Sequence, residues 1–213
     1  MNFENAHKGI GLLFTGLILE IIAEVLAGVG LIAGASAKSW ETIVVLVLVL
    51  VAAGVGIASF IQTLRGLIWA KKDEPCFGYA LAITIATLVA SALASIFGTT
   101  GNAGGIGTTI VAALGALFEC VTIVLVCDGI SNIYRQKGNI ARAKEGLNTG
   151  IIFVIVYAVA KALEILVTSS IASKGTSTWS ATLILILAIV TVVLTIVAFV
   201  KFVVYLNRAR QEI

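Results

Sequence analysis

Apolar residues fall along this chain in six long runs that are separated by short polar segments. The runs cover residues 9–34, 42–69, 77–98, 106–133, 149–172 and 180–205. A helix of roughly 20 apolar residues crosses the hydrocarbon of a bilayer, and one proline in 213 residues leaves almost every run free to be a continuous helix. Alternating polar and apolar strands typical of a membrane barrel are absent from the sequence. The pattern predicts an all-α polytopic membrane protein with six transmembrane helices.

The connections between the runs alternate in character. Short segments rich in Gly, Ser and Thr join the first run to the second, the third to the fourth and the fifth to the sixth. The other two connections are basic, and the one between the fourth and fifth runs is longer. This alternation returns about every 68 residues, as in a chain built from repeated units. We therefore predict one transmembrane domain, residues 1–213, made of three tandem helical hairpins at approximately 8–75, 76–145 and 146–213.

The basic residues indicate how the helices are oriented. Most lysines and arginines fall on one predicted side of the membrane: Lys8, Arg65, Lys71, Lys72, Arg135, Lys137, Arg142, Lys144, Lys201, Arg208 and Arg210. Only Lys38 and Lys174 fall on the opposite side. Because cytoplasmic loops carry the excess of Lys and Arg, both termini are expected in the cytoplasm and the protein in the cytoplasmic (plasma) membrane. The pattern is typical of small bacterial inner-membrane proteins and implies no activity.

The amino-acid composition of the chain limits the classes of function that it can have. The chain is 60% hydrophobic and 12% charged, whereas soluble domains have about a quarter of their residues charged. The net charge of +3 follows from the membrane-side distribution of basic residues, so no nucleic-acid partner is expected. One histidine and three cysteines without zinc-ligand spacing predict no metal and no cofactor. No catalytic motif is present, and we expect a protein that is not an enzyme.

Five ionisable residues lie inside the apolar runs and are the main functional pointer: Glu20, Glu24, Glu119, Lys161 and Glu164. An ionisable group at membrane depth costs several kcal/mol unless it is paired, neutralised or hydrated. Glu20 and Glu24 are four residues apart on one helix face, and the charged helices are expected to turn these faces toward protein. One hypothesis is a channel or carrier that moves an ion or small solute along these groups, with Glu24 and Lys161 as the main functional pair. The alternative is that neutral glutamates hydrogen-bond between helices, beside a local Lys161–Glu164 pair.

Small residues at helical spacing give a second hypothesis. Ala86, Ala90 and Ala94 follow one face of the third run, and Gly30 and Gly34 follow one face of the first. Such faces allow close helix contacts, either within one chain or between copies. The chain would then be a non-catalytic assembly or accessory subunit that forms a homo-oligomer or docks onto another membrane protein, with membrane lipid as its other partner.

Overall fold

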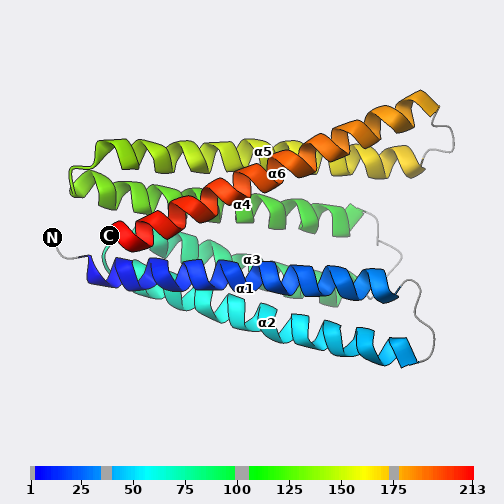
Figure 1. Ribbon diagram of the computed structural model, residues 1–213, viewed down its shortest axis with the longest axis horizontal. Helices are drawn as coiled ribbons and strands as arrows, with labels where there is room; N and C mark the ends of the chain where they lie inside the picture. Colours follow the sequence, from blue (N-terminus) through cyan, green and yellow to red (C-terminus); the bar gives the residue numbers. More distant parts are fainter. Residues whose placement is uncertain (1–2, 35–39, 99–105, 173–177) are drawn as a thin grey trace. The chain divides into compact units, whose positions relative to one another are not determined.

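The structure, a computed structural model, describes residues 3–34, 40–98, 106–172 and 178–213, and these residues contain helices and no strand. The helices are α1 (Glu4–Gly34), α2 (Trp40–Ala70), α3 (Cys76–Gly98), α4 (Ile106–Gln136), α5 (Ile140–Ala172) and α6 (Thr178–Glu212) (Figure 1). The cores of the three Gly/Ser/Thr-rich connections lie outside the described residues.

Five helices contain a segment that is long and apolar enough to cross a membrane. These segments are Glu4–Gly30, Thr42–Ala70, Leu117–Gln136, Ile140–Ala160 and Ile189–Glu212. The all-helical fold and these five segments agree with the prediction of a helical membrane protein. In α3 the apolar segment found among the described residues, Cys76–Ala90, is shorter, so a sixth crossing stays a prediction.

The helices extend further at the connection between α4 and α5 than the apolar runs predict. Helix α5 begins at Ile140, well before the predicted boundary at residue 149. The cap that ends α4 and the cap that starts α5 both lie within residues 137–139. Gly138 has φ of +79°, and the Asn139 N–H donates to the Tyr134 carbonyl at 2.8 Å, which together end α4 with a left-handed glycine. Asn139 then caps α5, since its Oδ1 accepts the Arg142 N–H at 3.2 Å. Hydropathy locates the membrane boundary, whereas these caps decide where the helices end.

The chain forms two compact units, which we treat separately. The first unit comprises Met1–Gly78 and Leu206–Ile213, and the second comprises Tyr79–Tyr205. In the first unit α1 and α2 run side by side, and in the second α4 and α5 do so (Figure 1). The α1–α2 pair comprises the two helices of the first predicted hairpin. The α4–α5 pair crosses the boundary placed between residues 145 and 146, and the arrangement as three tandem hairpins stays a prediction.

Small residues every seven positions bring α1 and α2 together. On α1 they are Gly9, Gly16, Ala23 and Gly30. A β-carbon at Gly16 would lie 2.6 Å from Thr63 Oγ1, the position of Ala23 faces Gly56, and a β-carbon at Gly30 would lie 3.5 Å from Val49. Ser59 Oγ also donates across the pair to the Gly16 carbonyl at 2.8 Å. Because lipid tails are as apolar as Leu, helices in a membrane associate through this kind of close backbone approach, and the seven-residue period keeps the contact on one face.

The approach is tightest at the end where α1 begins. A β-carbon at Gly9 would lie 2.6 Å from the Gly66 carbonyl and 2.7 Å from the Ala70 nitrogen. Beyond this contact the turn after α2 holds the start of α1, because Asp73 accepts the Ala6 N–H at 2.7 Å and the Asn5 Nδ2 at 2.9 Å. Asp73 therefore satisfies an otherwise unpaired N–H in the first turn of α1 from a distant part of the chain.

We predict that Gly9→Ala destabilises the first unit. The added methyl group would meet backbone atoms of α2, and overpacking of this kind costs about 1–3 kcal/mol. The measurement is the midpoint of thermal unfolding of the purified protein in detergent.

The matched control is Gly28→Ala on the same helix, where nothing lies within 4 Å of the new β-carbon. Alanine is the better helix former by up to about 1 kcal/mol, so Gly28→Ala should leave the midpoint unchanged or raise it. Equal losses for the two variants would contradict the role given to the α1–α2 contact.

Candidate functional site

Two glycines on α5 set its register against α4. A β-carbon at Gly150 would lie 3.2 Å from the Cys127 β-carbon, and one at Gly146 would collide with the Tyr205 hydroxyl and the Ser131 hydroxyl. Ser131 Oγ turns back to the Cys127 carbonyl at 2.7 Å, which satisfies that hydroxyl within α4. These contacts place the two helices antiparallel, so that residue numbers fall along α4 as they rise along α5.

Two turns further along this register, α4 and α5 share a polar contact. The Tyr157 hydroxyl donates to Glu119 Oε2 at 2.7 Å. Glu119 lies near the midpoint of α4 (Ile106–Gln136) and Tyr157 near the midpoint of α5 (Ile140–Ala172). One of the five ionisable residues singled out from the sequence therefore has a hydrogen-bond donor on the neighbouring helix, at the middle of both helices.

A group of aromatic rings positions Tyr157. The Phe153 ring stacks on the Tyr157 ring with centroids 6.1 Å apart and planes 17° apart. On its other side Phe153 meets Phe202 of α6 at 6.0 Å in a tilted arrangement. Phe153 and Phe202 are both buried, and aromatic pairs at these separations are favourable beyond the area that they bury. Aromatic side chains of α5 and α6 thus position the donor that reaches Glu119 of α4.

The two carboxylates of α1 lie beside the contact that this helix makes with α2. Glu20 and Glu24 are exposed, although Gly16, one turn before them, is buried against α2. A straight helix turns by about 40° over each four residues, so the Gly16–Glu20–Glu24 row rotates away from the contact with α2. Glu119 is likewise exposed beside its bond to Tyr157. Glu20, Glu24 and Glu119 are therefore all exposed beside the helix pairs that carry them.

The other two ionisable residues lie on α5, and their side chains are outside the described ones. Their backbone positions follow Tyr157 by one and two helical turns. The sequence-based pairing of Lys161 with Glu24 stays a prediction.

The small residues singled out from the sequence lie in two settings. Gly30 is buried in the α1–α2 contact at Val49. On α3, Ala86 is exposed and Ala90 is half-buried. The side chain of Ala94 and the surroundings of Gly34 lie outside what the structure describes.

Metal ligands do not gather in the described part of the chain, where no three His, Cys, Asp or Glu residues come together. Comparison with protein-family models, with curated proteins and with solved structures finds no match. The membrane assignment therefore depends on the helices themselves, and the specific membrane and the side on which the termini lie stay predictions.

The sequence did not identify Tyr157 as the partner of Glu119. The available signal was the hydroxyl itself, because a tyrosine in the middle of an apolar helix needs a hydrogen-bond partner. The identity of that partner followed only from the α4–α5 register, which the glycines at 146 and 150 determine.

We predict that Tyr157→Phe and Glu119→Met, which removes the acceptor oxygens and keeps a side chain of similar length, are energetically coupled. The phenylalanine variant removes the donor and keeps the ring against Phe153, so the loss reports the hydrogen bond. Double-mutant cycles of such bonds in membranes give about 0.6 kcal/mol on average and up to about 1.7 kcal/mol. The measurement is the free energy of unfolding in mixed micelles for the wild type, both single variants and the double variant.

Tyr79→Phe provides the control, because Tyr79 is 65% exposed at the start of α3. Its cycle with Glu119→Met should be additive. Additivity in the Tyr157 cycle as well would show that the Glu119–Tyr157 hydrogen bond contributes nothing to the fold.

Proposed function

We propose that this membrane protein is a small channel or carrier that moves an ion or small solute past carboxylates in its helices. The observation that carries the proposal is the exposure of Glu20, Glu24 and Glu119, each well inside an apolar helix. An ionised carboxylate facing lipid costs several kcal/mol. Water in a polar path is an environment that removes this cost and also gives the groups a role.

The Glu119–Tyr157 contact supports a path beside α4 and α5. A phenol donates to a carboxyl group in either of its charge states, so the contact fixes the position of Glu119 without fixing its charge. One hydrogen bond worth about 1 kcal/mol does not offset the burial of a charge. The ionised form of Glu119 therefore requires water or a cation close by.

Lys161 is the candidate cation for this position. It is the one lysine among the five ionisable residues within the apolar runs, and it follows Tyr157 by four residues on α5. A lysine among glutamates lowers the cost of holding charge at this depth. The proposal gives Lys161 and the glutamates the role of stabilising the transported species or its counter-charge.

We predict that Glu24→Gln and Lys161→Met each abolish flux in proteoliposomes while the protein stays folded. Three probes cover the possible classes of solute: protons followed with a trapped pH dye, monovalent cations followed with a trapped indicator, and small neutral solutes followed by vesicle swelling. Each variant removes one charge from the proposed path. Helicity and elution volume in detergent report whether the variants remain folded.

Glu4→Gln is the matched control, since Glu4 lies in the first turn of α1 and pairs with Lys8 at 2.8 Å. Its flux should equal that of the wild type. Wild-type protein that passes none of the three probes above empty vesicles, or unchanged flux in both path variants, would contradict the transport assignment.

A second candidate function is supported by α3. Ala86 is exposed on the small-residue face of this helix, and exposed small residues are suited to close contact with another helix. In this alternative the chain is a non-catalytic assembly or accessory subunit, and a partner helix covers the face of Ala86 and Ala90.

We predict for this alternative that Ala90→Leu disrupts a complex formed by the wild-type chain. The larger side chain would hold the partner helix away from the α3 backbone. Native mass of the protein extracted in its own lipid patch measures the effect. Ala92→Leu, the same change about half a turn around α3, should leave the mass unchanged, and an unaltered mass for Ala90→Leu would exclude this face as the interface.

A further inference from the structure

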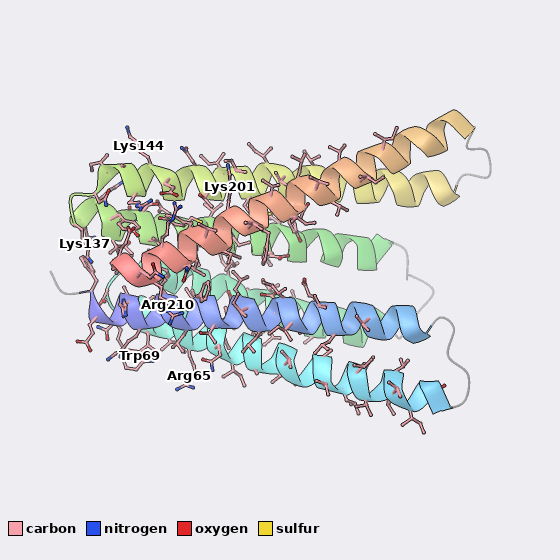
Figure 2. The ribbon with its side chains drawn as sticks, viewed as in Figure 1. Arg65, Trp69, Lys137, Lys144, Lys201 and Arg210 are labelled. Carbon is pink, nitrogen blue, oxygen red and sulfur yellow. The ribbon has the colours of Figure 1, made fainter. Side chains whose placement is uncertain are left out.

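A basic and aromatic cluster lies where α1 begins and α2 ends. Its members are Lys8 of α1, Arg65 and Trp69 of α2, and Lys72 of the following turn. The Lys72 ammonium lies 4.1 Å from the centroid of the Trp69 ring, and the Lys8 ammonium lies 5.7 Å from it. Figure 2 shows Arg65 and Trp69 projecting from the same side of α2. Two segments that are distant in sequence therefore bring cations to one indole ring.

The fold holds these groups in place before any ligand arrives. Asp73 accepts two hydrogen bonds from the start of α1, and Gly9 packs on the α2 backbone one residue after Lys8. Lys8 and Trp69 are consequently fixed on adjacent helices at the same level. Preorganised groups bind a ligand without a further cost of ordering the helices that carry them.

The cluster carries positive charge that the described residues do not neutralise. Lys8 pairs with Glu4 at 2.8 Å, but both side chains are more than half exposed, and exposed pairs of this kind are weak. Arg65 and Lys72 are exposed and make no ion pair with a carboxylate in the described part of the chain. With Lys71 included, the four basic residues at this end exceed its three carboxylates, Glu4, Asp73 and Glu74, by one charge, so the surface around the indole ring is net positive.

The depth of Arg65 indicates what covers this surface. Arg65 lies one helical turn, about 6 Å, further into the apolar segment of α2 than Trp69. Its neighbours on the helix, Ile61 and Ile68, are 48% and 43% exposed, as on a surface that faces lipid. Tryptophan occupies the headgroup level, and an arginine just below it extends its guanidinium up to that level. The anionic group available there is the phosphate of a phospholipid.

We propose that Lys8, Arg65, Trp69 and Lys72 form a binding site for the headgroup of an anionic phospholipid. Arg65 and Lys72 contact the phosphate from two sides, and Trp69 packs against the glycerol and the upper acyl chain. The site is independent of the proposed transport path, because its residues lie at the membrane surface and include none of the five ionisable residues of that path.

Quenching of Trp69 by brominated lipids tests the proposal on the full chain. The protein has three tryptophans, so the background variant Trp40→Phe with Trp179→Phe leaves Trp69 as the only indole. The purified variant is placed in phosphatidylcholine vesicles in which either the phosphatidylcholine or added phosphatidylglycerol carries brominated acyl chains. The ratio of quenching at equal mole fractions gives the preference for the anionic lipid at Trp69.

We expect phosphatidylglycerol to be preferred at Trp69 by about fivefold or more, since each cation near an anionic lipid contributes about 1 kcal/mol, equivalent to about fivefold. Arg65→Gln with Lys72→Gln should remove the preference. Arg65→Lys should keep most of it, because the charge remains. Lys144→Gln, at an exposed lysine of the second unit, should leave it unchanged.

Three results would overturn the proposal. Equal quenching by the two lipids would show that no anionic lipid is selected. An equal loss in Lys144→Gln would show a general effect of surface charge and not a site. Equal quenching by the two lipids, together with a saturable change of Trp69 fluorescence on addition of inorganic phosphate, would show that the site takes a free phosphate and not a lipid headgroup.

Discussion

The hydrocarbon of the bilayer contains no water, and the structure of this protein follows from that constraint. Each backbone N–H and C=O inside the membrane must find its partner within the protein, and an α-helix supplies that partner within one segment. Apolar side chains gain little by leaving lipid for another apolar surface, so helix pairs must gain from close packing. The contact of Gly9 and Gly16 with α2, and of Gly146 and Gly150 with α4 and α6, meets this requirement in each unit. A missing side chain at these positions allows backbones to approach and fixes the register of the helices.

Register then determines which polar groups meet. Glu119 and Tyr157 lie on different helices and 38 residues apart, and they come together because Gly150 holds α5 against Cys127 two turns away. At the membrane surface, helix register likewise determines which charged groups meet. Asp73 satisfies the start of α1, and Trp69 lies under two ammonium groups beside it. Close packing in the apolar part of each pair therefore positions the polar groups in its middle and at its end.

The sequence predicts the helical membrane fold well and the site only in part, for physical reasons. Solvation by lipid acts on each residue almost independently, so the apolar runs mark the helices directly. Helix ends depend on single capping residues, and for this reason Gly138 and Asn139 move the start of α5 to Ile140, away from the hydropathy boundary. The partner of Glu119 depends on register between helices. A spacing of seven residues between small side chains, as in Gly9, Gly16, Ala23 and Gly30, carries that information for α1 and α2, but hydropathy does not measure it.

The cost of an ionisable group at membrane depth bears directly on the role proposed for the glutamates. A hydrogen bond between membrane helices contributes about 1 kcal/mol, and small residues already hold both helix pairs together. A glutamate used only for packing would therefore add little stability and would cost several kcal/mol whenever it ionised. This cost applies to Glu20 and Glu24 in particular, because both side chains are exposed beside the α1–α2 contact. A chain that places carboxyl groups outside its packing contacts, at the depth where they are most costly, has an arrangement suited to water, to a transported species or to a partner that supplies the opposite charge.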